Sequence, residues 1–185
     1  MYERLNQAII YATVHHEGSY RKGTNIPYIV HPFGAMMIMM LSGIHDEDVL
    51  ISILLQDLIE DTAVTSPDIE MVFGKPVATL VESASEPNKS DTWENRKQHT
   101  IDGMKNKTYE MKLVTLADKY NNLESIYQDY QTCGEDVWQR FARPKIQQAW
   151  YYRQLSEALA KDEEIKALEL YKGFEKLVQQ VFEPV

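Results

Sequence analysis

The chain has 185 residues, of which 44% are hydrophobic, together with a single cysteine and a formal net charge of −9 at pH 7. This length suits one domain with its own core, and one cysteine excludes an internal disulfide. The acidic balance argues against a general nucleic-acid binder, which needs a basic face, although a few basic residues can still converge on a small phosphate ligand. The longest apolar run, 49–55, is far too short for a membrane span, and the first residues lack the pattern of a signal peptide. We therefore expect a cytoplasmic protein that binds neither nucleic acid nor membrane.

Helical periodicity dominates the chain, and no segment has a convincing strand pattern. Capping side chains and prolines mark several helix starts, at Asp46 or Asp48, at Ser66-Pro67-Asp68 and at Pro144. The sequence predicts a single all-α domain over residues 1–185. The expected helices are 2–16, 32–43, 49–61, 67–73, 75–85, 93–105, 109–127, one that opens at Pro144, and 162–182, with candidate lid or rim loops at 86–92 and 128–137.

Three acidic residues end the predicted helix 49–61. Asp57, Glu60 and Asp61 are spaced i, i+3 and i+4, so they lie near one face. Carboxylates at a helix C-terminus cost about 1 kcal/mol or more unless a cation compensates for the helix dipole. A divalent metal or a facing basic cluster would do so, and the alternative is a solvated acidic helix end. Asp57 follows an apolar stretch and is expected to be buried, which favours pairing or metal binding.

Two other segments offer partners for these carboxylates. His31 follows the apolar Tyr28-Ile29-Val30 and can bind a metal through a neutral ring nitrogen, although an isolated histidine of this kind can also be a satisfied core residue. Asp118 lies in an otherwise apolar helical stretch, where an acid is unexpected. The alternative for Asp118 is a salt bridge to Lys119 or Arg21.

Together these segments resemble the HD superfamily of metal-dependent phosphohydrolases, and within it the (p)ppGpp hydrolase domain of RelA/SpoT-type proteins and their small stand-alone relatives. The resemblance covers almost the whole chain. It rests on three ordered motifs: ATVHHEGSYRKGTNIPYIVHP (12–32), LLQDLIEDT (54–62) and VTLADKYNNL (114–123). Three further segments resemble a bacterial subgroup of stand-alone members: TWENRKQHT (92–100), DVWQRF (136–141) and KIQQAWYY (145–152). It implies an all-helical HD fold, hydrolysis of a guanine nucleotide or related phosphorylated substrate, and a part in the stringent response.

The resemblance also implies a set of site residues. A divalent metal, usually manganese, would be held by His31, by position 56 with Asp57, and by Asp118. Glu60 and Asp61 match the acidic pair that orients or activates the attacking water. The remaining positions concern the substrate. Arg21 and Lys22 match basic residues near it, and Asn122 matches a position that lines the nucleotide pocket. In an active enzyme Lys145 would join the basic residues, and Tyr151 or Trp150 would stack on the base, with core packing as the alternative for these two aromatic side chains.

One position departs from the family pattern. The motif histidine is replaced by Gln56, and an amide oxygen is a weaker ligand for manganese than an imidazole nitrogen. His31, Asp57 and Asp118 can still hold an ion with extra waters, at lower affinity. Two functions follow, a metal-dependent nucleotide (pyro)phosphohydrolase or a non-catalytic nucleotide-binding sensor, and we favour the first. A pure interaction module with a relic pocket is disfavoured because the other site residues are present.

Overall fold

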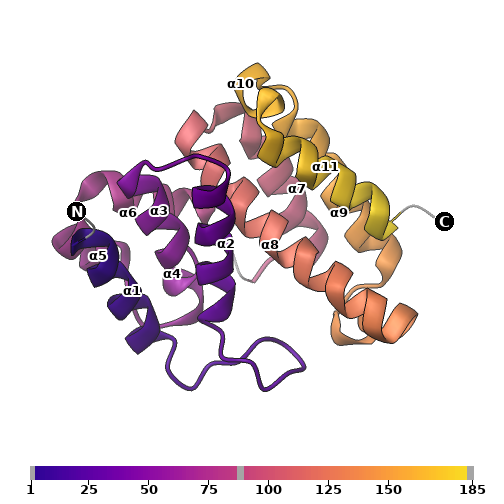
Figure 1. The fold of residues 1–185 in the computed structure, drawn as a ribbon, viewed down its shortest axis with the longest axis horizontal. Coiled ribbons are helices and arrows are strands. Elements are labelled where there is room, and N and C mark those ends of the chain that lie inside the picture. Colours follow the sequence, from indigo (N-terminus) through magenta and orange to yellow (C-terminus); the bar gives the residue numbers. More distant parts are fainter. Residues whose placement is uncertain (1–2, 87–89, 183–185) are drawn as a thin grey trace. The chain divides into compact units, whose positions relative to one another are not determined.

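The structure is a computed structural model that describes residues 3–86 and 90–182 (Figure 1). Within these ranges every regular element is a helix, and the only β-type pairing is an isolated bridge between Tyr20 and Pro27. The predicted all-α class is therefore confirmed. The elements are α1 (Glu3–His15), α2 (Val30–Leu41), α3 (Glu47–Leu55), α4 (Leu58–Asp61), α5 (Ser66–Phe73), α6 (Lys75–Ala84), α7 (Trp93–Gly103), the short 3-10 helix η1 (Met104–Asn106), α8 (Tyr109–Cys133), a second 3-10 helix η2 (Gly134–Arg140), α9 (Lys145–Leu159), α10 (Glu163–Ala167) and α11 (Glu169–Phe182).

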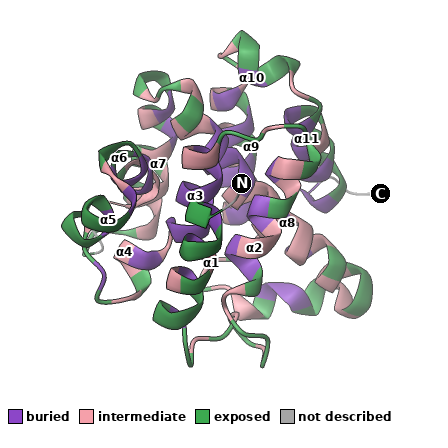
Figure 2. Ribbon diagram, turned by 60° about the vertical axis from the view of Figure 1, so that its left-hand side comes forward, coloured by how far each residue is buried: buried purple, intermediate pink, exposed green. Residues whose placement is uncertain are grey.

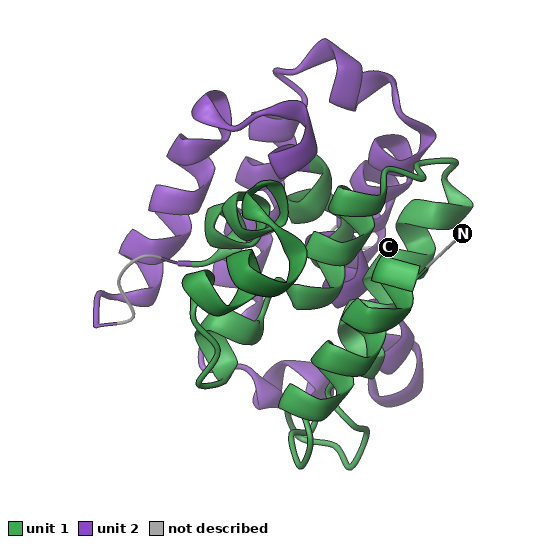
Figure 3. Ribbon diagram, turned by 90° about the vertical axis from the view of Figure 1, so that its left-hand side faces the viewer, with its two compact units in different colours: residues 1–85, 113–118 green, residues 86–112, 119–185 purple. Residues whose placement is uncertain are grey.

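The chain forms two compact units, coloured separately in Figure 3. Unit 1 contains residues 1–85 together with 113–118, and unit 2 contains residues 86–112 and 119–185. The long helix α8 therefore contributes residues to both units. None of the helices in the described ranges combines the length and hydropathy needed to cross a membrane.

Helix α3 is the centre of unit 1. It packs against α1, α2 and α6, and α5 packs against α6. All residues from Val49 to Leu55 are buried, so α3 contributes apolar surface on every side (Figure 2). Full burial stabilises a side chain such as leucine or isoleucine by about 1.5–3 kcal/mol relative to exposure, and this helix therefore anchors the core that positions the residues after it.

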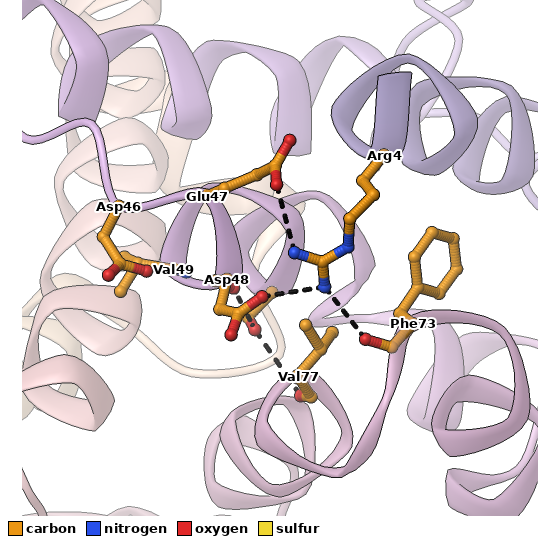
Figure 4. A network of polar contacts seen from close by, with 8 residues as sticks. Arg4, Asp46, Glu47, Asp48, Val49, Phe73 and Val77 are labelled. Carbon is orange, nitrogen blue, oxygen red and sulfur yellow. Dashed lines mark hydrogen bonds and ion pairs between the residues drawn. The ribbon is translucent and has the colours of Figure 1, made fainter. Parts of the chain in front are cut away.

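The start of α3 is fixed by Arg4 from α1 (Figure 4). The guanidinium donates to Glu47 at 3.0 Å and to Asp48 at 2.8 Å, and it also donates to the carbonyl oxygen of Phe73 at 3.0 Å. Both carboxylates lie in the first turn of α3, where the helix dipole favours negative charge. One exposed cation thus joins α1, the N-terminus of α3 and the end of α5.

Unit 2 is built around α9, which packs against α7 and α11, while α10 packs against α11. Its core includes an aromatic cluster, in which the ring of Tyr152 lies 6.3 Å from that of Phe174 and 5.6 Å from that of Phe182. The ion pair between Lys112 and Asp162, 2.6 Å apart, joins the start of α8 to the cap of α10.

The helix expected over 49–61 is broken, which corrects the sequence prediction. Gln56 and Asp57 form a turn between α3 and α4 while keeping helical backbone angles. The carbonyl of Asp57 accepts from the backbone N–H groups of Glu60 and Asp61, at 3.2 and 2.9 Å. Asp57 therefore precedes a new helix rather than ending the old one, so the argument from an unfavourable helix dipole does not apply to it.

Two further boundaries differ from the prediction. The segment expected as a loop at 128–137 is helical, since α8 continues to Cys133 and η2 follows at once. The last helix divides at Leu168 into α10 and α11. Part of the predicted loop at 86–92, residues 87–89, lies outside the described residues.

Candidate functional site

His31 is the meeting point of the predicted motifs. It lies in the first turn of α2 and is 2% exposed. Its Nε2 lies 3.1 Å from Oδ1 of Asp118 in α8 and 3.5 Å from Oδ2 of Asp57. All three residues belong to unit 1. The geometry brings residues from all three motifs into contact, and the carboxylate of Asp118 is directed to the histidine rather than to bulk solvent, with its side chain 13% exposed.

Gln56, the substituted position, lies beside the same histidine. It is 2% exposed, and its amide nitrogen is 3.4 Å from Nε2 of His31. Its Oε1 is buried and has no hydrogen-bond partner among the described residues. A buried acceptor left unpaired costs about 1–3 kcal/mol. This oxygen therefore sits where a cation or a water molecule would satisfy it.

The chemistry of the donors fits a divalent metal ion. Two carboxylates contact one imidazole nitrogen, the side chain of Gln56 contacts the same nitrogen through its amide group, and oxygen-rich sets of this kind suit manganese. Within residues 3–86 and 90–182, however, no group of three or more His, Cys, Asp or Glu side chains has the arrangement of a ready-made metal site. The donors pair with each other instead, so their role as metal ligands stays a prediction.

Tyr28, from the loop before α2, completes this cluster. Its hydroxyl donates to Oδ2 of Asp57 at 2.9 Å, and its ring lies between His16 and His31 with the Arg21 guanidinium 5.7 Å from its centre. Burial raises the pKa of the Tyr28 hydroxyl far above its usual range, and the nearby carboxylates raise it further. The hydroxyl therefore stays protonated and acts as a donor. The apolar character of the segment around Tyr28 does not by itself predict this role.

His16 is a second residue to which sequence reasoning assigned no role. It is 3% exposed, and neither ring nitrogen has a hydrogen-bond partner within the described part of the chain. Burial lowers the pKa of His16, although nearby carboxylates oppose the shift. A signal was present, because His16 lies four residues after the buried Ala12 and thus continues the inward face of α1, whereas the adjacent His15 is exposed. His16 also lines a surface hollow of about 370 Å³ with Tyr20 and Pro27.

The predicted water-activating and phosphate-binding residues also lie in unit 1. Glu60 is half-buried and Asp61 is exposed, both in α4. Arg21 is half-buried over the Tyr28 ring, which places it beside the His31 cluster, and Lys22 is exposed. The roles of these four residues in water activation and phosphate binding stay predictions.

The other predicted substrate residues lie in unit 2. Asn122 is half-buried in α8, one turn after Asp118. Lys145 pairs with Glu135 at 2.8 Å. Tyr151 is buried, and its ring lies 6.2 Å from that of Trp93, which matches the alternative of core packing. Nucleotide contacts by these three residues stay predictions.

Comparison with known proteins decides the family. The sequence profile described as HD domain matches residues 8–146, which include all three motifs. The chain belongs to the HD domain family. Its resemblance to the RelA/SpoT-type branch of HD phosphohydrolases is confirmed by individual relatives.

Three relatives of this HD-family chain are informative. Guanosine-3′,5′-bis(diphosphate) 3′-pyrophosphohydrolase MESH1 of Danio rerio is 33% identical over 128 residues, 69% of this chain and 68% of the relative. The bifunctional (p)ppGpp synthase/hydrolase SpoT of Escherichia coli K12 is 34% identical over 130 residues, 67% of this chain but only 18% of SpoT. The solved structure of a metazoan SpoT orthologue, described as hydrolysing ppGpp, has 25% identity and a TM-score of 0.79, with 96% of this chain and 95% of that chain covered. The all-helical HD fold therefore extends over nearly the whole chain.

Proposed function

We propose that this HD-family chain is a metal-dependent hydrolase that removes the 3′-pyrophosphate of (p)ppGpp or a closely related guanine nucleotide. The observation that carries the proposal is the contact of His31 with both Asp57 and Asp118, because it joins the motifs that a metal-dependent phosphohydrolase needs. The relatives named as (p)ppGpp 3′-pyrophosphohydrolases support the substrate class. A cytoplasmic location, a part in the stringent response and a single domain over residues 1–185 are further parts of this proposal.

In the proposed reaction each residue has a defined task. A divalent ion, for which we propose manganese, would polarise the phosphate and lower the pKa of the attacking water when bound. His31, Asp57 and Asp118, with the unpaired oxygen of Gln56, are the residues that would hold it.

Proton transfer and charge neutralisation fall to the flanking residues. Hydrolysis adds water across the ester between the 3′ oxygen and the pyrophosphate, so one proton leaves the water and one reaches the released 3′ oxygen. Glu60 with Asp61 would orient the water and accept its proton. Arg21 and Lys22 would neutralise the pyrophosphate, because charge-assisted bonds from arginine to phosphate are strong and directional.

A second candidate function is nucleotide binding without turnover. It is favoured by one observation, the glutamine at position 56 where the family motif has histidine. Replacement of an imidazole by an amide weakens binding of a transition metal. A chain that binds the nucleotide but not the metal would act as a sensor.

The variant Gln56→His separates the two functions. Changes in groups that merely support a metal ligand already alter affinity about 10–100-fold, so regaining a ligand should tighten manganese binding by at least tenfold. Hydrolysis of (p)ppGpp should rise with it. Bound manganese and released pyrophosphate are measured side by side for the parent and the variant.

The matched control is Gln7→His, which adds a histidine at an exposed position of α1. It should leave manganese affinity and turnover unchanged. Tight binding and fast turnover in the parent would show that Gln56 is no handicap. A Gln56→His protein that binds manganese but releases no pyrophosphate would refute the substrate.

A further inference from the structure

The ring of Tyr28 is held on several sides. It lies 4.8 Å from the ring of His16 and meets the ring of His31 edge-on at 5.9 Å. The guanidinium of Arg21 lies 5.7 Å from its centre, and the Tyr28 backbone N–H donates to the carbonyl oxygen of Ser19 at 2.8 Å. These contacts fix both the ring and its backbone, so the position of the hydroxyl is fixed as well.

That hydroxyl acts on one particular oxygen. It donates to Oδ2 of Asp57 at 2.9 Å, and the same oxygen is the one that lies 3.5 Å from Nε2 of His31. An ionised carboxylate oxygen has two lone pairs, so it can accept from Tyr28 and still present a lone pair to another partner. The hydroxyl thus restrains rotation of the Asp57 carboxylate without occupying all of its acceptor capacity.

We propose that Tyr28 is a positioning residue that orients the Asp57 carboxylate for cation binding. The inference rests on the proposed metal-dependent function, but it assigns a task to a residue outside the ligand set. Partners behind metal ligands fix the orientation of those ligands, and their loss lowers metal affinity about 10–100-fold. Tyr28 fits this task because its ring is held by contacts with His16, His31 and Arg21.

The variant Tyr28→Phe tests the inference, because it keeps the ring and removes only the hydroxyl. Manganese affinity is measured by calorimetric titration in the parent and in Gln56→His, each with and without Tyr28→Phe. The dissociation constant should rise about 10–100-fold on loss of the hydroxyl. Tyr20→Phe is the matched control, since Tyr20 lies in the same loop and is 58% exposed, and it should leave the affinity unchanged.

Thermal melting with and without manganese separates positioning from folding. Tyr28→Phe should melt near the parent in chelator and show a smaller rise in melting temperature on adding manganese. Unchanged affinity and an unchanged rise would overturn the role of Tyr28 while leaving the proposed function intact. Absence of manganese binding in both the parent and Gln56→His would defeat the proposed function, and the inference with it.

Discussion

Two histidines of unit 1 are equally buried but have opposite polar surroundings. His31 is 2% exposed and contacts two carboxylates, whereas His16 is 3% exposed and has no hydrogen-bond partner for either ring nitrogen among the described residues. Burial makes protonation of His16 less favourable, because the charged imidazole loses its hydration, and this outweighs the attraction of the nearby carboxylates.

Acidification should destabilise the protein through His16. Burial lowers the pKa of His16 in the folded state, so the unfolded chain binds this proton first. The contribution of neutral His16 to the free energy of unfolding is therefore complete above about pH 6.5, the ordinary pKa of histidine, and it falls as the pH drops below that value. His16→Gln should flatten the fall between about pH 7 and 5 in urea unfolding curves recorded in chelator. A slope in His16→Gln equal to that of the parent would contradict the assignment.

Loss of Arg21 should weaken nucleotide binding far more than folding. The side chain is half-buried and lies over Tyr28 beside the site. Hydrogen bonds to a charged group are worth about 1.5–3 kcal/mol, so Arg21→Ala should weaken binding of (p)ppGpp roughly 10–100-fold. Calorimetry without added metal measures the affinity, and thermal melting checks the fold. Lys75→Ala, at an exposed position of unit 1, should have no effect. Equal affinities in Arg21→Ala and the parent would remove Arg21 from the site.

At the scale of elements, short-range side-chain hydrogen bonds stabilise the starts of two helices in unit 1, α3 and α5. Asp46 accepts from the backbone of Val49 at 3.0 Å and caps α3. Thr65 caps α5, and both its backbone N–H and its hydroxyl donate to the Asp68 carboxylate, at 2.9 and 2.5 Å. The Thr65 hydroxyl and N–H hold the pKa of Asp68 below its usual range. These contacts at the starts of α3 and α5 join residues no more than three positions apart in sequence.

Removing one cap should cost stability without touching the site. Thr65→Ala should lower the free energy of unfolding by about 1 kcal/mol, the usual value for loss of an N-cap side chain. Urea denaturation measures it, and manganese affinity should not change because α5 contributes no predicted ligand. Thr13→Ala, at an exposed position inside α1, should leave stability equal or slightly higher, since alanine is the better helix former. Stability equal to the parent in Thr65→Ala would mean that the cap contributes nothing.

The same locality explains which features the sequence could predict. Asp46 and Pro144 marked their helix starts because a cap or a proline acts on adjacent residues. The break at Gln56-Asp57 was missed because both residues keep helical angles, so hydrophobic periodicity does not register the turn. The role of the Tyr28 hydroxyl was not predicted because its partner, Asp57, lies 29 residues away in sequence, and no local pattern encodes such a contact.

At the scale of the whole molecule, net charge determines which polyanions the chain can hold. With a charge of −9 and pI near 5.0, we expect the chain to gain little from counterion release on a nucleic-acid duplex. The proposed phosphate-binding residues, Arg21 beside Tyr28 and the exposed Lys22, would serve one nucleotide rather than a polymer. The prediction of a single domain over residues 1–185 stays a prediction, since the HD profile matches residues 8–146 and the chain forms two compact units.

Duplex RNA and DNA should therefore not bind. Fluorescence anisotropy with labelled duplexes at low salt should show dissociation constants weaker than roughly 10⁻⁴ M, the weak end of ordinary non-specific binding. A labelled guanine nucleotide in the same buffer is the positive control. Binding to the duplexes that weakens steeply with added salt would contradict this expectation.

The division of α8 between the two units has a consequence for genetics. Residues 113–118 of this helix belong to unit 1, although 27 residues of unit 2 (86–112) precede them in the chain. A gene truncated after Ser85 therefore encodes His31 and Asp57 but omits Asp118, and a gene that begins at Glu86 encodes Asp118 alone. Nonsense mutations in this interval should behave as complete losses of function, because neither half of the reading frame carries all three predicted ligands.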